Sequence, residues 1–312
     1  MSWSAADIPD QHGRTAVVTG ANGGLGLVTA RALAAKGAHV VMAVRNQEKA
    51  ADAAEEIRAA APDCSLELVA LDLSSQASVK EAAGQIVAAH NHIDLLVNNA
   101  GVMAIAEART VDGFEMQFGV DHLGHWTLTA LLLPALLRTP GSRVVTVTST
   151  AHLMGRPVDV ANPHLEGHYG PWRAYGQAKL ANFHFGLGLQ RELQRVGART
   201  ASLIAHPGLS NTDLQAVSVE GSGGGASQRF FHVMAQLTGM SANNGALPQL
   251  RAATDPAAKG GEFYGPAFVN NGPPVRKPIL HRVGMDRAIA SLWEVSERET
   301  GVSLDLHTSA SA

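Results

Sequence analysis

The amino-acid sequence predicts an α/β fold: a doubly wound parallel sheet with helices on both faces, in a single domain over residues 1–312. Two observations carry this prediction. Short runs rich in Val, Leu and Ile alternate along the chain with longer segments of helical spacing. The apolar runs are nearly continuous, as in strands that are buried on both faces of a parallel sheet. Right-handed crossovers between such strands then produce the doubly wound arrangement.

The individual elements follow from these patterns. We expect strands at residues 15–20, 38–44, 66–71, 93–98, 143–149 and 199–205. We expect helices at 26–37, 47–61, 78–90 and 243–254, a helix that carries Tyr175 and Lys179, and a tail helix at about 286–300. Gly37 and Pro62 are ordinary helix-stop signals. The apolar stripe of the tail helix predicts packing, either on the domain or on a partner subunit.

Composition narrows the class of protein. The chain is 46% hydrophobic and 16% charged, with a net charge of −3 and no basic block, which argues against nucleic acid as a partner. A single cysteine, Cys64, rules out a disulfide framework within the chain and fits a reducing compartment. The first residues lack a signal-peptide pattern. The longest apolar run, 131–137, is too short to span a bilayer and is interrupted by Pro134. We therefore expect a cytoplasmic protein without a membrane span.

A glycine-rich segment, "TGANGGLG" at 19–26, joins the first strand to the first helix. Glycines there permit a tight turn and let backbone amides approach a pyrophosphate at the helix N-terminus, where the helix dipole favours negative charge. The alternative is an ordinary Gly/Asn turn. The position at a strand–helix junction favours dinucleotide binding, with these cofactor-binding candidates: Gly20, Asn22, Gly24, Leu25 and Gly26.

The end of the second strand indicates which dinucleotide binds. A carboxylate there would accept hydrogen bonds from the free ribose hydroxyls of NAD(H), but the chain has Val44 and then Arg45. A guanidinium suits a 2′-phosphate, so we predict NADP(H) as the cofactor. The alternative is that Arg45 is a solvated residue at the start of a helix.

Two later strand ends supply further candidates. Asp72, followed by Leu73, bonds the adenine amino group or simply starts the next helix. In "NNAG" at 98–101, Asn99, Ala100 and Gly101 let the backbone pass close to a flat ligand, although the segment is also a turn signal.

Together, "TGANGGLG", "LDL", "NNAG", "TST…YGQAK" and "HPG" (206–208) resemble the signatures of the short-chain dehydrogenase/reductase family over roughly residues 13–215. "RNQEKA", "FGVDHLGHW" and "AKLANFHF" resemble its retinol-dehydrogenase-like and WW-domain-oxidoreductase-like members. The resemblance implies a Rossmann-type fold and a carbonyl/alcohol oxidoreductase acting on an apolar small molecule. It also raises a homodimer as an oligomeric state.

Tyr175 and Lys179 lie four residues apart and therefore share one helical face. A nearby ammonium, together with the positive charge of an oxidised nicotinamide, favours the phenolate and lowers the pKa of a tyrosine, which then exchanges a proton with an alcohol or alkoxide. The resemblance assigns Tyr175 as the acid/base, Ser149 as the ligand of the substrate oxygen, and Lys179 as the partner that lowers the pKa and binds the ribose. Tyr175 and Lys179 thus count among both the catalytic and the cofactor-binding candidates. The alternative is a half-buried tyrosine with a lysine extending to solvent. Thr148, the neighbour of Ser149, would point to the opposite side of the strand.

Asp121 departs from the family pattern, in which an asparagine usually helps to hold a helix kink and a water of the proton relay. Aspartate keeps an acceptor oxygen, loses the amide donor and adds a charge that opposes phenolate formation. A second function is therefore kept open: an NADP(H)-binding sensor or scaffold with little turnover. His122 and His125 beside Asp121 suggest a metal ligand set, but we see no further ligand cluster in the sequence and predict no metal site.

The remaining candidates surround the presumed crevice. Pro207 and Gly208 turn the chain over the nicotinamide and Thr212 bonds a phosphate or the carboxamide, unless "HPG" is a plain loop. The glycine-rich segment within about 209–240 is either a mobile lid or a surface linker. Four side chains either line a substrate pocket or merely pack: Tyr169, Trp172, Met234 and Met240. Three histidines are interpreted as polar pocket or surface residues rather than catalysts, since Tyr175 already supplies the acid/base: His152, His164 and His168.

Overall fold

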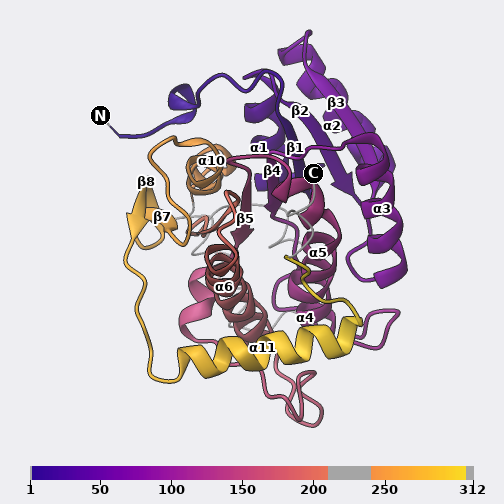
Figure 1. Ribbon diagram of the computed structural model, residues 1–312, viewed down its shortest axis with the longest axis vertical. Coiled ribbons are helices and arrows are strands. Elements are labelled where there is room, and N and C mark those ends of the chain that lie inside the picture. The colour runs from indigo at the N-terminus through magenta and orange to yellow at the C-terminus, as the bar shows by residue number, and fades with distance from the viewer. Residues whose placement is uncertain (1, 210–239, 307–312) are drawn as a thin grey trace.

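The computed structural model describes residues 2–209 and 240–306 and contains one sheet of eight strands with helices on both sides (Figure 1). The strands, in chain order, are β1 (Thr15–Thr19), β2 (His39–Val44), β3 (Ser65–Ala70), β4 (Leu95–Asn98), β5 (Arg143–Val147), β6 (Ala201–Ala205), β7 (Phe263–Phe268) and β8 (Asn271–Lys277). Their order across the sheet is β3-β2-β1-β4-β5-β6-β7-β8, and only the β7–β8 pair is antiparallel. The predicted doubly wound parallel sheet is confirmed, as are the six predicted strands.

The helices are α1 (Gly24–Ala34), α2 (Gln47–Ala60), α3 (Gln76–Ala89), α4 (Met116–Phe118), α5 (Gly124–Leu137), α6 (Pro171–Arg195), α9 (Ala242–Gly245), α10 (Leu247–Thr254) and α11 (Met285–Thr300). Short 3₁₀ turns occur at Ala5–Asp7 (η1) and Thr150–Leu153 (η3), and a π-helical turn, η2 (Gly119–Leu123), joins α4 to α5. Two of the longer helices, α2 and α3, start with a side-chain cap. Asn46, for example, accepts a hydrogen bond from the Lys49 amide at 2.9 Å at the start of α2.

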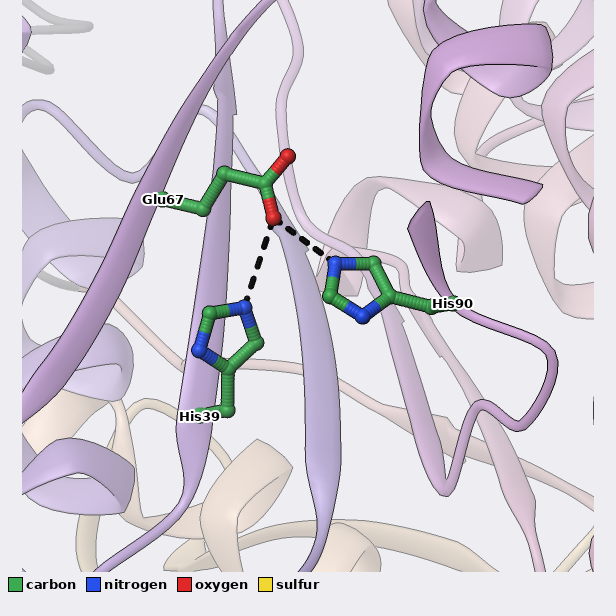
Figure 2. Close-up of side chains that lie close together, drawn as sticks. All are labelled: His39, Glu67 and His90. Carbon is green, nitrogen blue, oxygen red and sulfur yellow. Dashed lines mark hydrogen bonds and ion pairs between the residues drawn. The ribbon is translucent and has the colours of Figure 1, made fainter. Parts of the chain in front are cut away.

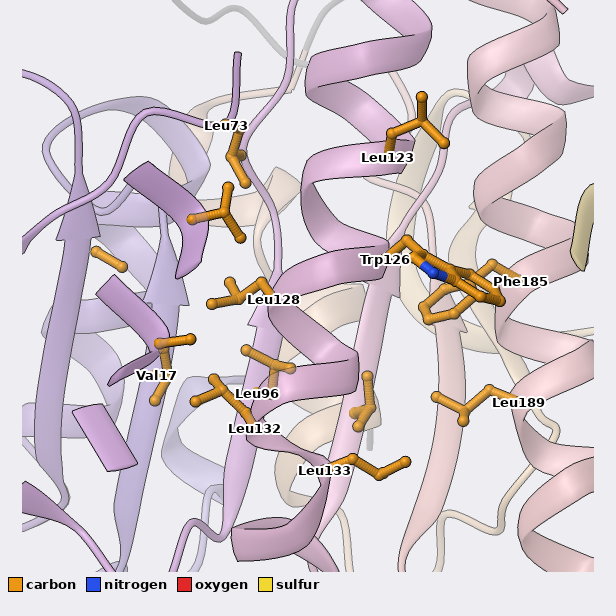
Figure 3. Packing of buried hydrophobic residues seen from close by; sticks show 14 of the residues in the cluster. Val17, Leu73, Leu96, Leu123, Trp126, Leu128, Leu132, Leu133, Phe185 and Leu189 are labelled. Atoms are coloured by element: carbon orange, nitrogen blue, oxygen red, sulfur yellow. The ribbon is translucent and has the colours of Figure 1, made fainter. Parts of the chain in front are cut away.

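Apolar side chains on each face of the sheet bind the two helical layers to it. On one face, α3, α5 and α6 pack against the strands, α11 covers α6, and Trp126 and Phe185 fill the space between α5 and α6 (Figure 3). On the other face, α1, α2 and α10 bury residues such as Leu33, Ile57 and Leu250. Burial on both faces explains why the strands have continuous apolar sequences.

The tail helix α11 crosses the lower part of α6 in Figure 1 and packs on it. The Trp293 ring lies so close to Gly188 of α6 that an added Cβ there would come within 2.3 Å of it. Leu292 and Val295 are fully buried in the core. Of the two alternatives for this helix, the structure shows packing on its own domain.

Three expectations need correction. β7 and β8 were not predicted, because "FYGPAF" and "NGPPVRK" contain the glycine and prolines that usually exclude strands. β8 lies at the edge of the sheet, so the N–H groups that its prolines lack are not needed by a further strand. The expected helix at 243–254 is divided into α9 and α10. Pro134 was expected to break the apolar run, but it lies within α5, and the helix continues past it to Leu137. Among the described residues, no helix is both long enough and apolar enough to cross a bilayer.

Candidate functional site

The glycine-rich turn lies at the carboxyl end of β1, where the strand order reverses between β1 and β4. Gly20 adopts a left-handed conformation with φ of 67°. A Cβ at Gly26 would lie 2.2 Å from the carbonyl oxygen of Gly20, so no larger residue fits the start of α1. This close packing presents the first amides of α1 toward the reversal point, where doubly wound proteins bind ligands.

Thr19 and Asn99 tie this turn to the neighbouring strand end. The Thr19 hydroxyl accepts hydrogen bonds from the amides of Asn99 and Ala100, each at 2.9 Å. The Asn99 side chain donates to the Thr19 carbonyl at 2.9 Å. The "NNAG" segment therefore connects the ends of β1 and β4. Its residues Ala100 and Gly101 also line a pocket.

That pocket brings seven of the sixteen predicted cofactor-binding residues together. It runs from the glycine-rich turn past the ends of β2 and β3 to the start of η2. Its lining includes Gly20, Asn22, Val44, Arg45, Asp72, Leu73, Ala100 and Gly101. Gly24, Leu25 and Gly26 follow in α1, and Asn99 lies behind the pocket. The lining also includes Asn46 and Lys49, which the sequence argument missed although "RNQEK" places Lys49 one helical turn after Arg45.

Two predicted nucleotide residues have specific local contacts. One carboxylate oxygen of Asp72 accepts hydrogen bonds from the amide and the hydroxyl of Ser74, at 2.9 and 2.7 Å. Asp72 therefore stabilises the turn that leads into α3, which agrees with the alternative that it starts this helix. Arg45 is exposed at the pocket. Its guanidinium is in a position to meet a ligand there.

The three catalytic candidates converge at the carboxyl end of β5. Ser149 follows this strand and caps η3. The Ser149 side chain lies close enough to the Tyr175 phenol in α6 to favour its ionised form. The Lys179 Nζ lies 5.5 Å from the centre of the Tyr175 ring. Thr148, the neighbour of Ser149, contacts the backbone of the same helix: its hydroxyl donates to the Lys179 carbonyl at 2.6 Å.

Asp121 lies in direct contact with Lys179. Its Oδ2 is 2.9 Å from the Lys179 Nζ, and the two side chains are 0% and 7% exposed. Its Oδ1 accepts a hydrogen bond from the Val102 amide at 2.7 Å. Asp121 belongs to the π-helical turn η2, which is the irregularity that the family resemblance implied here. A Cβ at Gly101 would lie 3.0 Å from Asp121 and 3.1 Å from Lys179, so only glycine leaves the pair undisturbed.

The charges of this group modify each other. Burial raises the pKa of the Tyr175 phenol, Lys179 and Ser149 lower it in part, and Asp121 raises it further. Burial opposes the charge of Lys179, but Asp121 and Tyr175 more than offset this and raise its pKa. Burial likewise raises the pKa of Asp121 against the opposing effect of Lys179.

The expectation of a lowered tyrosine pKa counted the charge of Lys179 together with that of an oxidised nicotinamide. In the chain by itself Lys179 lowers the pKa of Tyr175, as expected, but burial outweighs this effect and Asp121 compensates much of the lysine charge.

The neighbouring histidines have separate partners rather than a shared ligand. His122 contacts the Ser296 hydroxyl at 2.8 Å, and burial lowers its pKa to about 3. His125 contacts Thr19 at 2.9 Å, and burial lowers its pKa to about 4. Both rings are therefore neutral, and His125 supports the turn beside the nucleotide pocket.

Other predicted lining residues are now placed. Tyr169 donates to the Ile105 carbonyl at 2.8 Å and accepts from Gln117 at 3.0 Å, which indicates a packing role. The Trp172 ring meets the Tyr175 ring edge-on at 6.0 Å. Met240 is buried, and His168 is exposed. His164 contacts Glu299 at 3.2 Å.

The "HPG" loop packs under the β7–β8 connection. Gly208 has φ of 70°, and an added Cβ would lie 2.5 Å from the Asn270 carbonyl. Pro207 precedes it at the carboxyl end of the sheet. Thr212, Met234 and most of the predicted glycine-rich lid lie outside the described residues.

A separate apolar cavity lies between α6, β7 and the start of α11, with Leu180, Phe183, Phe263 and Met285 in its wall. His152 is part of this wall, with its ring stacked on Phe183 at 4.7 Å. Ser149, Tyr175 and Lys179 do not line the cavity. We therefore do not assign the reacting group of a substrate to it.

A glycine-rich turn at the carboxyl end of β1, with a serine, tyrosine and lysine near the carboxyl end of β5 in the same sheet, is typical of the class of nicotinamide-dependent oxidoreductases. The family model for short chain dehydrogenases matches residues 14–222. The chain belongs to the short-chain dehydrogenase/reductase family.

Relatives of established name are similar over part of their length. The chain is 45% identical to polyprenol dehydrogenase of Mus musculus over 211 residues, which is 66% of this chain and 63% of that protein. It is 42% identical to retinol dehydrogenase 13 of Homo sapiens over 212 residues, 68% of this chain and 62% of that protein. The chain thus matches less than two thirds of the length of these relatives.

Solved structures agree with the fold. A crystal structure of an uncharacterized protein from Mycobacterium Paratuberculosis has 39% sequence identity and a TM-score of 0.79, covering 98% of this chain and all (100%) of that one. An NAD(P) dependent gluconate 5-dehydrogenase from Beutenbergia cavernae with bound NADP has 26% identity and a TM-score of 0.62, covering 80% of this chain and 92% of that one.

Proposed function

We propose that the chain is an NADP(H)-dependent oxidoreductase that interconverts a carbonyl compound and an alcohol, with Tyr175 as the acid/base. The observation that carries this proposal is the convergence of three side chains: Ser149 lies near the Tyr175 phenol and favours its ionised form, and the Lys179 Nζ lies 5.5 Å from the centre of the Tyr175 ring. An alcohol or carbonyl oxygen bound between the two hydroxyls would be within reach of both.

The residues around the pocket fit a dinucleotide. The packed turn at Gly20 and Gly26 admits no side chain, so a pyrophosphate can approach the amides of α1. Arg45 and Lys49 supply two cations at the end of β2, where an NAD-binding chain would have a carboxylate. Both features support NADP(H), as does the NADP found in the gluconate 5-dehydrogenase structure. Such a cofactor supplies hydride acceptance and donation when it is bound.

The chain's own residues handle the proton and the substrate oxygen. In alcohol oxidation, the Tyr175 phenolate takes the hydroxyl proton while Ser149 donates a hydrogen bond to the same oxygen. In the reverse direction, Tyr175 returns that proton to the oxygen of the carbonyl substrate. Lys179 favours the phenolate, and Asp121 keeps Lys179 protonated and in place.

The substrate class that we propose is a lipophilic primary or secondary alcohol and its carbonyl partner. The names of the two mammalian relatives, a polyprenol and a retinol dehydrogenase, support this class. A cytoplasmic location and a homodimer remain predictions.

A second candidate function is an NADP(H)-binding sensor with little turnover. The buried Asp121–Lys179 pair favours it, because it compensates the cation that would stabilise a phenolate. The two candidates differ in one measurable property, which is turnover by a chain that binds its cofactor.

The test follows nicotinamide absorbance with NADPH and with NADH against a panel of apolar aldehydes and ketones. We expect turnover that prefers NADPH and that falls at least 100-fold in Tyr175→Phe, in line with the usual contribution of a positioned acid/base. Arg45→Glu should reverse the cofactor preference without changing the rate at saturating cofactor. Tight NADPH binding with no turnover across the panel would support the sensor instead.

A further inference from the structure

A second group of chemically capable side chains lies at the opposite end of the strands from the nucleotide pocket. His39 begins β2, Glu67 lies in β3, and His90 is the C-cap of α3. Figure 2 shows the two imidazole rings directed at the Glu67 carboxylate. Within the described part of the chain, this is the one group of three or more His, Cys, Asp or Glu side chains whose donor atoms converge.

The sheet register places these residues on one face. His39 pairs with Ser65, and Val41 pairs with Glu67, so strand alternation puts His39, Ser65 and Glu67 on the same side. Helix α3 packs on that side through residues such as Ile86, and His90 follows where the helix ends. The sequence predicted no metal site, because these three residues are far apart along the chain and converge only through this register.

The donor atoms already have the spacing of a metal site. Glu67 Oε2 lies 2.7 Å from His90 Nε2 and 3.3 Å from His39 Nε2. One donor atom from each of the three residues lies within 4.8 Å of the others. A zinc ion about 2.1 Å from each of its tetrahedral ligands separates them by about 3.3 Å. Only small movements of the side chains are therefore needed to admit the ion.

A further contact prepares His39 for this role. Its Nδ1 lies 2.7 Å from the Ser65 hydroxyl, which can hold a proton on Nδ1 and leave the Nε2 lone pair facing Glu67. Such a bond to the second ring nitrogen is what metal-ligating histidines usually have. In that tautomer the Nε2 lone pair of His39 and the carboxylate of Glu67 repel each other. A cation between them would be bound by both and would remove this repulsion.

The environment leaves room for exchange with solvent. The side chains of His39, Glu67 and His90 are 28%, 32% and 17% exposed. An ion can therefore enter from water and keep a water molecule as its fourth ligand.

We propose that His39, Glu67 and His90 form a binding site for a divalent cation of the zinc class, a site separate from the catalytic crevice. Two imidazoles and one carboxylate are ligands that Zn²⁺, Co²⁺ and Ni²⁺ accept well. Bound there, the ion connects the end of α3 to β2 and β3. It stabilises the folded chain because it binds the native arrangement and not the unfolded one.

The test uses the full chain after treatment with a chelator. Titration with Zn²⁺ in a calorimeter should show one equivalent bound to the native protein, with a rise in melting temperature as Zn²⁺ increases. Co²⁺ in its place should give the visible absorption of a tetrahedral site. His90→Gln should remove that equivalent and the rise in melting temperature. Ser65→Ala should weaken the affinity by about 10-fold or more, as the loss of such supporting bonds does.

His92→Gln is the matched control, since His92 is an exposed histidine two positions from His90 and outside the cluster. It should bind Zn²⁺ as the unmodified chain does. In the presence of chelator, His90→Gln and the unmodified chain should both melt cooperatively, which shows that the variant folds. Absence of Zn²⁺ binding by the unmodified chain, or unchanged binding in His90→Gln, would overturn the proposal. Loss of binding in His92→Gln alone would assign the ion to a different site.

Discussion

Replacing Asp121 with asparagine tests the electrostatic account of the site most directly. The Asp121 Oδ2 lies 2.9 Å from the Lys179 Nζ, which itself lies 5.5 Å from the centre of the Tyr175 ring. Asparagine has nearly the same shape and keeps an oxygen that can accept the hydrogen bond from the Val102 amide. The change therefore removes a charge and leaves the local geometry largely intact.

The size of the effect follows from Coulomb's law. The carboxylate lies within about 8 Å of the phenol ring centre, where a unit charge changes the free energy of ionisation by about 2 kcal/mol at an effective dielectric constant of about 20. This corresponds to about 1.5 pKa units. Because Asp121 raises the pKa of Tyr175, its removal lowers that pKa and favours the phenolate.

The assay is the pH dependence of alcohol oxidation at saturating NADP⁺, with the best substrate from the panel. Oxidation needs the phenolate, so kcat/KM rises with pH through the pKa of Tyr175. In Asp121→Asn this rise should move by about 1.5 units toward lower pH, and turnover near neutral pH should stay equal or increase. The free energy of unfolding should fall by about 3 kcal/mol, because Lys179 loses its buried charged partner.

Asp121→Ala is the control, because it removes both the charge and the acceptor for the Val102 amide. We expect it to lose activity at every pH through misplacement of Lys179. A loss above tenfold in Asp121→Asn, or a profile that does not move, would refute the reasoning. The first result would show that the carboxylate is needed in the proton path. The second would show that it carries no charge in the folded chain.

Three further predictions concern single residues. Gly26→Ala places a Cβ 2.2 Å from the Gly20 carbonyl, so NADPH affinity measured by fluorescence titration should fall at least tenfold; equal affinity would mean that the turn relaxes freely. Burial raises the pKa of Glu115 to about 7, so the stability that it contributes is present below about pH 4.5 and is lost as pH rises through about 7. In the unmodified chain this loss lowers the free energy of unfolding by up to about 3 kcal/mol between urea melts near pH 5 and pH 8, and in Glu115→Gln the decrease should disappear. Thr148→Val removes the hydrogen bond to the Lys179 carbonyl and should lower stability by about 1 kcal/mol while kcat stays within about twofold; a large loss of kcat would place Thr148 in the proton path.

The sequence by itself determined the parallel sheet, the position of the nucleotide turn and the shared helical face of Tyr175 and Lys179. These features depend on local signals: continuous apolar runs, glycine at a strand–helix junction, and a spacing of four residues within one helix.

Only the tertiary structure decided the features that depend on contacts between distant segments. The balance of charges at Tyr175 required the contact of Asp121 with Lys179, which the π-helical turn creates against α6. The strand character of "FYGPAF" and "NGPPVRK" depends on their places in the sheet. β8 is an edge strand, and β6 pairs only with Phe263 and Tyr264 of β7, which precede Pro266. The convergence of His39 and Glu67 required the register of β2 against β3, since register is a property of paired strands and is absent from either segment alone.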